Sequence, residues 1–365
     1  MSNNTQVSFS EIINHFLKDA EVLKCDKFGN GHINGTFLAL CKTDGEEIYY
    51  ILQHINKNVF KSPELVMDNI EKVTSFIGKK VSNPREVLHF IKCDNGTLCY
   101  KDQEGEYWRM YYYVDKCDGV DHPTLEEFYE SGVAFGKFQS QLSDFPAETL
   151  NETIPDFHNT PKRYETFLKA VENNLSGRKD TCQEEIEFVK ARADFYSTLM
   201  DANKQGKLPL RVSHNDTKSN NVLLDDTTHK AVCVIDLDTI MPGFSVTDFG
   251  DSIRFGANNS SEDEKDLTKL TIDMDKFRIY TKGFLEGCGG RLPKEEVELL
   301  PEGALMMTLE CGMRFLSDYL DGDTYFRTAY PEHNLVRCRT QLKLASEMEK
   351  RFDEMKSIVR EFAKQ

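Results

Sequence analysis

The chain has 365 residues, enough for two domains or two unequal lobes, with 39% hydrophobic and 29% charged residues as in ordinary globular proteins. Its net charge of −16 argues against a nucleic-acid-binding protein, because the phosphate backbone attracts basic surfaces. The sequence contains no apolar run of membrane-spanning length, and its first residues lack the basic and apolar regions of a secretion signal. These features predict a cytoplasmic protein.

The first third of the chain has the pattern of a small β-rich lobe. A helix is expected over residues 8–24, opened by a capping box of Ser8 and Glu11. Residues 1–114 are predicted to form an antiparallel N-lobe, and the polar segment 115–122 a hinge. The other elements expected in the N-lobe are strands at 36–41, 48–53, 87–92, 97–101 and 107–114, a hairpin turn at 43–46 and a helix at 63–77.

Helical patterns dominate the remainder, residues 123–365, which are predicted to form a C-lobe. Two short strands, around 210–212 and 232–235, interrupt the helices. The sequence therefore predicts an α+β fold with two lobes, a small antiparallel-sheet N-lobe and a larger, mainly helical C-lobe. The expected helices are 125–142, 162–174, 184–204, 274–285, 304–320 and 334–362.

The loop between the two short strands carries the residue types that phosphoryl transfer needs. Asp216 is followed by Asn221, and the next hydrophobic strand ends at Asp236. A carboxylate in such a loop receives the proton of a substrate hydroxyl, so Asp216 is predicted to be the general base. Asn221 and Asp236 offer the hard oxygen ligands that Mg²⁺ prefers. A turn acid of the Asx type would explain Asp216 alone, but not this spacing of three residues.

The neighbours of this loop have less specific signals. His214 is expected to brace the turn by hydrogen bonding and is assigned no proton transfer. Lys218 either reaches the transferred phosphate or is solvated. The triplet at 248–250 spells the metal-binding motif of protein kinases, yet it lies far beyond Asp236, so Asp248 is expected to support the loop by hydrogen bonding. Asp238 is expected to be a solvated acid, with a contact to the metal site as the alternative.

The N-lobe has a glycine-rich segment but lacks one residue of the usual nucleotide site. Gly29, Asn30 and Gly31 are expected to cover the nucleotide phosphates, because such residues reach positive φ at low cost; a plain hairpin turn is the alternative. At the strand position where kinases carry a phosphate-binding lysine, this chain has Gln53. Glu71 stands where the partner of that lysine would lie, and a Gln53–Glu71 hydrogen bond is expected.

The motif from His214 to Asn221, with Asp236, resembles the aminoglycoside phosphotransferase and choline kinase superfamily, which has a protein-kinase-like fold. The resemblance is closer still to the N-acetylhexosamine 1-kinases and extends from about residue 10 to 345. The segments that carry it are 29–34, 51–53, 108–111, 156–160, 248–251, 309–315 and 321–326.

This resemblance implies ATP-dependent phosphorylation of the anomeric C1 hydroxyl of N-acetylglucosamine or N-acetylgalactosamine, with Mg²⁺ as cofactor. It implies the roles given above for the base and the metal ligands. Without it, Arg314 would be expected to pair with Asp318 one helical turn along, and Tyr325 to pack between helices. The resemblance further implies that Tyr113, Val114 and Asp115 receive adenine and that His32, Asp251, Arg314 and Tyr325 contact the sugar.

Two alternatives stay open. The first is a kinase for choline, an aminoglycoside or another small alcohol, because an acidic protein steers cationic acceptors toward itself. The second is a nucleotide-binding pseudokinase, for which Gln53 is the motive and the intact Asp216, Asn221 and Asp236 the counter-argument. The expected partners are ATP and a small sugar, with no nucleic acid, no membrane and no obligatory protein partner.

Overall fold

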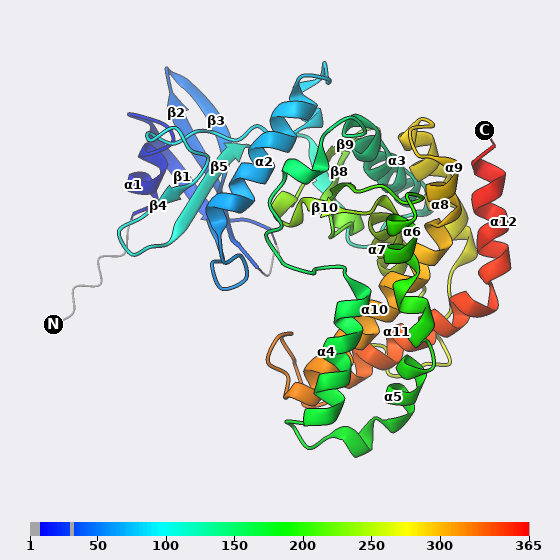
Figure 1. Cartoon of the computed structure of the whole chain (residues 1–365). Helices are drawn as coiled ribbons and strands as arrows, with labels where there is room; N and C mark the ends of the chain where they lie inside the picture. The colour runs from blue at the N-terminus through cyan, green and yellow to red at the C-terminus, as the bar shows by residue number, and fades with distance from the viewer. Residues whose placement is uncertain (1–7, 30–32, 365) are drawn as a thin grey trace.

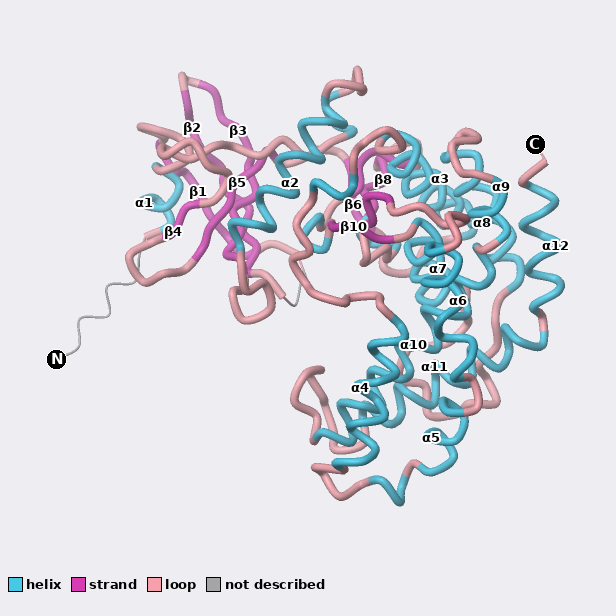
Figure 2. The backbone as a smooth tube through the Cα atoms, viewed as in Figure 1, coloured by secondary structure: helices cyan, strands magenta, loops and turns pink. Residues whose placement is uncertain are grey.

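The computed structural model describes residues 8–29 and 33–364 and divides them into two lobes (Figure 1). In that view the sheet of the N-terminal lobe lies at the left, and the helices of the C-terminal lobe lie at the right and below. Figure 2 shows the strands in two groups, one at the left and one in the middle of the molecule. The predicted α+β architecture, with a sheet-rich first lobe and a mainly helical second lobe, is confirmed.

The N-terminal lobe contains an antiparallel sheet of five strands in the order β1-β2-β3-β5-β4. The hairpin predicted at 43–46 is present: Asp44 and Gly45 both have positive φ, 53° and 86°, as a tight two-residue turn requires. The predicted helix at 63–77 is α2 (Pro63–Gly78), which buries one face. The strands are β1 (Glu21–Lys27), β2 (Gly35–Thr43), β3 (Glu46–Ile55), β4 (Tyr100–Lys101) and β5 (Tyr107–Tyr112).

The start of the chain differs from the prediction. Helix α1 (Phe9–Asn14) is short, although the side chain of Ser8 accepts a hydrogen bond from the backbone N–H of Glu11 as an N-cap should. Asp19 has a φ of 61°, which no α-helix accommodates, and residues from Glu21 onward pair with β2. The gain of a full strand partner thus overrides the helical periodicity expected up to residue 24.

The strand predicted at 87–92 is also wrong, because that segment makes only one isolated bridge, between Phe90 and Tyr111. The hinge segment 115–122 contains a short strand, β6 (Cys117–Gly119). It forms a sheet with β8 (Val222–Asp225) and β9 (Ala231–Val234), in the order β6-β8-β9. Strand β7 (Arg211–Ser213) pairs with β10 (Met241–Gly243).

Most of the C-terminal lobe is helical. The helix predicted at 184–204 is divided by a 3₁₀ segment, and the one predicted at 334–362 is divided at Arg351. Helix α7 has no counterpart in the prediction. Its sequence is polar and glycine-rich, so it lacks the apolar periodicity of a helix, although the segment is almost wholly buried. The helices are α3 (Leu125–Gln141), α4 (Thr160–Asn173), α5 (Gln183–Lys190), α6 (Thr198–Lys204), α7 (Ser245–Gly256), α8 (Met274–Cys288), α9 (Lys294–Glu298), α10 (Leu300–Asp321), α11 (His333–Lys350) and α12 (Phe352–Phe362).

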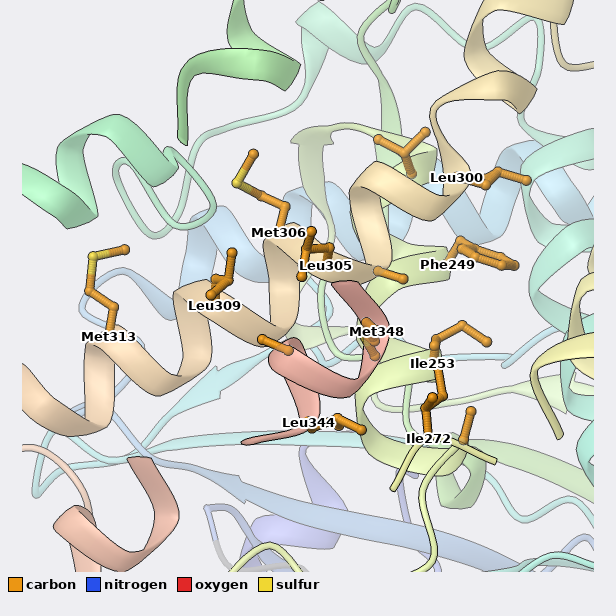
Figure 3. Packing of buried hydrophobic residues seen from close by; sticks show 14 of the residues in the cluster. Phe249, Ile253, Ile272, Leu300, Leu305, Met306, Leu309, Met313, Leu344 and Met348 are labelled. Carbon is orange, nitrogen blue, oxygen red and sulfur yellow. The ribbon is translucent and has the colours of Figure 1, made fainter. Parts of the chain in front are cut away.

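The core of this lobe is built around α10, which packs against both α7 and α11 (Figure 3). Two glycines let α7 and α10 cross closely. A Cβ atom on Gly250 would lie 2.3 Å from the carbonyl oxygen of Gly303, and one on Gly303 would lie 2.1 Å from that of Val246. Any larger side chain would therefore push the helices apart. Within the described residues, no helix combines the length and hydrophobicity that crossing a membrane requires.

Candidate active site

The predicted catalytic loop connects β7 to a 3₁₀ turn, Ser219–Asn221, that leads into β8. Asn221 donates from its side-chain amide to the backbone carbonyl of Asp216 at 2.8 Å, and approaches the carboxylate at 3.4 Å. The ammonium group of Lys218 lies 3.0 Å from the same carboxylate. The loop thus gathers the expected base, one expected metal ligand and a cation within hydrogen-bonding distance.

Asp236 is joined to this loop through backbone hydrogen bonds. The N–H of Ile235 donates to the carbonyl of Asn221 at 2.9 Å, and Nε2 of His214 lies 2.9 Å from the carbonyl of Ile235. Asp236 itself has a φ of 59°, so the chain turns sharply where β9 ends. The turn directs the residues after β9 back toward the loop, and Asp216 is near enough to influence the ionisation of Asp236.

The oxygens of Asp236 and Asn221 fit a magnesium ion. Asp236 is an exposed residue, yet nearby protein groups desolvate its carboxylate, and this desolvation with the charges of Asp238 and Asp216 raises its pKa to about 6. Among the described residues, the carboxylate of Asp236 and the amide oxygen of Asn221 take part in no hydrogen bond or ion pair. Mg²⁺ prefers hard oxygen ligands, and a carboxylate without a protein partner, such as that of Asp236, is a ligand of this kind.

No group of three or more histidine, cysteine, aspartate or glutamate side chains in residues 8–29 and 33–364 is arranged to hold a metal. A Mg²⁺ ion that arrives with a nucleotide needs only one or two protein ligands, because phosphate oxygens and water complete its coordination. The donor set therefore fits a cation that arrives with a nucleotide.

His214 is fully buried, with its ring edge-on to Phe135 and Phe138. Besides the contact of Nε2 with Ile235, its Nδ1 accepts from the N–H of Asp216 at 3.3 Å. Both ring nitrogens are thus engaged with backbone groups, one in the catalytic loop and one at the end of β9, directly before Asp236.

Carboxylates on helix α7 hold the catalytic loop through hydrogen bonds to its backbone. The buried carboxylate of Asp248 accepts hydrogen bonds from the backbone N–H groups of His214 and Asn215 and from the hydroxyl of Ser213, all at 2.8 Å. One turn later, Asp251 accepts from the N–H of Thr217 at 3.1 Å. Two carboxylates on one helix face therefore fix the backbone on both sides of Asp216.

Asp251 was expected to contact the acceptor. It is buried, and besides the bond from Thr217 it forms an ion pair with Arg254 at 2.8 Å. Both of its oxygens have protein partners, so a sugar contact would have to share them.

A buried polar network joins the two lobes, formed by Arg109 of β5, Asp238, Gln53 of β3 and Asn34. Asp238 is only 3% exposed and receives both terminal nitrogens of Arg109. The expectation of a solvated Asp238 is therefore wrong. Arg109 also donates from Nε to Gln53 at 2.8 Å, and Asn34 donates to Asp238 at 2.6 Å. We refer to these four residues as the interlobe network.

This network replaces the hydrogen bond expected between Gln53 and Glu71. Gln53 accepts from Arg109, its register partner on β5, and donates to Thr36. Glu71 instead forms an ion pair with Lys92 at 2.7 Å. The helix–strand ion pair of protein kinases is thus absent from this pair of positions, and the charge next to Gln53 belongs to an arginine on the neighbouring strand.

The remaining nucleotide-side residues are described only in part. Gly29 has a φ of 70°, which favours glycine, whereas Asn30, Gly31 and His32 lie outside the described residues. Tyr113, Val114 and Asp115 directly follow β5. Tyr113 is edge-on to Phe28 at 5.8 Å between ring centroids, and the carbonyl of Asp115 accepts from Arg85.

Two further residues expected near the acceptor have unexpected partners. Arg314 does not pair with Asp318, whose carboxylate accepts instead from the backbone N–H groups of residues 324–326. The loop that these bonds hold carries Tyr325, which is 68% exposed and so does not pack between helices. The guanidinium of Arg314 lies 5.8 Å from the ring centre of Tyr325.

The structure adds residues that sequence reasoning left without a role. His158, just before α4, lies 2.7 Å from Glu310 of α10 through Nδ1 and 3.5 Å from the carbonyl of Asn215 through Nε2. It therefore connects α10 with the residue before Asp216. Its segment was part of the family resemblance, but nothing in the local sequence indicated these distant partners.

Comparisons with known proteins show the family and the fold of this chain. A family model described as the phosphotransferase enzyme family matches residues 92–278, just over half of the chain, including the whole catalytic loop and Asp236. Similar solved structures include an aminoglycoside phosphotransferase from Alicyclobacillus acidocaldarius, 10% identical, covering 96% of this chain and 96% of that one, with a TM-score of 0.59.

A choline kinase from Cryptosporidium parvum is 13% identical, covers 98% of this chain and 96% of that one, and has a TM-score of 0.57. A spectinomycin phosphotransferase in complex with ADP and spectinomycin is 13% identical, covers 91% of this chain and 93% of that one, and has a TM-score of 0.52. At such identities the likeness shows a shared fold.

Proposed function

Since the chain belongs to the phosphotransferase enzyme family, we propose that it is a kinase that transfers the γ-phosphoryl group of ATP to the C1 hydroxyl of an N-acetylhexosamine. The observation that carries the proposal is a chain of two hydrogen bonds. Asn221 donates to the carbonyl of Asp216, and Ile235, directly before Asp236, donates to the carbonyl of Asn221. ATP as the phosphoryl donor is supported by the ADP held in the related spectinomycin phosphotransferase.

In the proposed reaction, Asp216 orients the acceptor hydroxyl and receives its proton while the hydroxyl oxygen attacks the γ-phosphorus. The bond between that phosphorus and the β,γ-bridging oxygen breaks, and ADP leaves. Asn221 and Asp236 would hold Mg²⁺, which neutralises negative charge on the phosphates when it is bound. The proton rests on the Asp216 carboxylate until product release returns it to solvent.

Lys218 is proposed to orient the base. Burial alone would lower the pKa of Lys218, but the carboxylates of Asp216 and Asp251 outweigh this effect and hold the pKa above its usual value. Lys218 therefore stays charged at neutral pH. It lies 3.0 Å from one oxygen of Asp216 and 3.4 Å from the other, and so restrains the orientation of the carboxylate toward the acceptor hydroxyl.

For ATP, the proposed contacts are the backbone of Gly29, Asn30 and Gly31 around the phosphates and the segment 113–115 around adenine. For the sugar, they are Arg314, Tyr325 and His32. A sugar needs hydrogen-bond donors between aromatic walls, and the guanidinium of Arg314 between aromatic rings supplies that combination. The specific sugar and its C1 position rest on the resemblance of segments 309–315 and 321–326.

The test is a coupled ADP-release assay with N-acetylglucosamine, N-acetylgalactosamine, choline and kanamycin as acceptors. Phosphorus NMR of the product then distinguishes a C1 phosphate from a phosphate on another hydroxyl. Turnover of choline or kanamycin with no turnover of either sugar would refute the sugar assignment. ATP binding with turnover of no acceptor would support a pseudokinase.

The base is tested with Asp216→Asn, which keeps the size of the side chain but removes its basicity. We expect kcat to fall by about 10²–10⁴-fold, the usual contribution of a general base. Asp353→Asn, at an exposed position of α12, is the matched control and should leave kcat unchanged. Equal turnover by Asp216→Asn and the wild type would rule out the proposed base.

A further inference from the structure

Two arginines near the catalytic loop, Arg163 of α4 and Arg314 of α10, have no carboxylate partner among the described residues. Arg314 forms no hydrogen bond or ion pair there. Its guanidinium instead lies 5.4–5.8 Å from the ring centres of Phe157, Tyr325 and Phe326. A guanidinium held by aromatic faces keeps its hydrogen-bond donors available for a ligand.

Arg163 contacts the backbone of the same residue, Phe157. It donates from Nε and Nη2 to the backbone carbonyl of Phe157 at 3.1 and 2.9 Å, and this is its only hydrogen-bonding partner among residues 8–29 and 33–364. Burial, and then the charge of Arg314, lower the pKa of Arg163. Two positive charges that both contact Phe157 thus lie close enough to repel each other.

Four carboxylates in this region, by contrast, already have partners, whereas Asp236 has none among the described residues. Asp216 pairs with Lys218 at 3.0 Å, and Asp251 with Arg254 at 2.8 Å. Glu310, the acid nearest to both arginines along α10, lies 2.7 Å from His158 and also accepts from Thr160. The carboxylate of Asp318, four residues from Arg314, is used by the backbone of 324–326.

The two arginines are also connected to the base. Phe157 precedes His158, whose ring lies 3.5 Å from the carbonyl of Asn215, the residue before Asp216. The segment with Phe157 and His158 therefore contacts both the catalytic loop and the two guanidiniums. The charge of both guanidiniums therefore acts on a molecule that presents a hydroxyl to Asp216, because the two arginines lie in a region of reduced dielectric.

We propose that Arg163 and Arg314 make the acceptor position electropositive and select neutral or anionic hydroxyl compounds against cationic ones. The net charge of −16 would favour cationic acceptors at long range, but the two guanidiniums, beside the segment that contacts the catalytic loop, act in the opposite sense. The inference rests on the proposed function for the location of the acceptor beside Asp216. It does not depend on which neutral acceptor reacts.

The experiment compares pairs of acceptors that differ in charge but little in shape. Choline is paired with its neutral isostere 3,3-dimethylbutan-1-ol, and glucosamine with N-acetylglucosamine. Binding to the Asp216→Asn protein is measured by saturation-transfer NMR, so that the readout does not need turnover. For each pair, we expect the neutral member to bind about tenfold more tightly than the cationic member, as one unscreened charge repulsion implies.

The variants Arg163→Gln and Arg314→Gln, made in the same background, should each reduce this preference severalfold. Arg163→Lys and Arg314→Lys keep the charge and should retain the preference even where overall affinity falls. Arg278→Gln, which removes an arginine paired with Glu361 on a distant helix, is the matched control and should change nothing. Thermal melting of each variant identifies loss of fold.

Preferential binding of the cationic members by the wild-type site, or an unchanged preference in both glutamine variants, would overturn the inference. Failure of the proposed function has a different signature. If neither N-acetylhexosamine reacts or binds, but 3,3-dimethylbutan-1-ol still binds more tightly than choline in an arginine-dependent way, the sugar assignment fails and the charge selection stands.

Discussion

Replacing Arg109 by methionine should destabilise the N-terminal lobe strongly. Arg109 is 2% exposed, and its guanidinium supplies two bonds to Asp238 and one to Gln53. Without it, the buried Asp238 would keep only the amide of Asn34 as a hydrogen-bond donor, with Asp236 two residues away. Removing one partner of a buried ion pair costs about 3–5 kcal/mol, because the other charge remains in a low-dielectric site.

The assay is urea unfolding followed by tryptophan fluorescence. Trp108 is the only tryptophan in the chain and precedes Arg109 on β5, so its emission reports on the lobe that contains the mutation. An urea m-value of about 2 kcal/mol/M would convert this loss into a midpoint shift of about 1.5–2.5 M. The exposed pair of Lys24 and Asp26 in the same lobe provides the control, Lys24→Met, for which no measurable shift is expected.

The double variant Arg109→Met/Asp238→Leu distinguishes an unpaired charge from lost packing. Replacing both partners of a buried pair by apolar side chains is often neutral, so the double variant should be more stable than Arg109→Met alone. Additive losses in the double variant, or a shift for Arg109→Met no larger than that of the Lys24 control, would refute the reasoning.

Two further predictions concern stability. Hydrogen bonds from the backbone N–H groups of Thr228 and Thr227, together with Arg85, lower the pKa of Asp225 to about 2. The ionised Asp225 therefore stabilises the folded state fully above pH 4, and this contribution is lost as the pH falls toward 2. Asp225→Asn should therefore flatten the pH dependence of the melting temperature in that window, and parallel profiles would contradict this. Gly250→Ala should cost about 1–3 kcal/mol by forcing α7 away from α10, whereas Gly78→Ala, with no atom within 4 Å, should not, as thermal melting will show.

The sequence was most informative where function depends on local spacing. Asp216 and Asn221 lie in one loop, and only a short apolar strand separates this loop from Asp236. The proximity of the three residues can therefore be predicted from a short stretch of sequence. The hairpin at Asp44 and Gly45 was predictable for the same reason, since turn chemistry is local. A short stretch of sequence contains all the information that these features need.

The interlobe network could not be predicted in this way. Arg109 and Asp238 are separated by 129 positions in the chain, and only the packing of β5 against the turn after β9 brings them together. An acid in a polar turn is ordinarily solvated, so the local pattern at Asp238 favoured the wrong answer. The same limit applies to residues 21–27, where a partner strand, rather than intrinsic periodicity, determines the backbone conformation.

The close crossing of α7 and α10 has a consequence for the reaction geometry. Asp248 on α7 holds the loop that carries Asp216, and Arg314 lies on α10, eleven positions after Gly303 at the crossing point, or about 16 Å along a helix. The separation between the base and this arginine is therefore determined by two rigid helices and one glycine contact. A substitution at the crossing should alter the positioning of the acceptor hydroxyl without touching either side chain, because close-packed helices transmit a displacement along their axes.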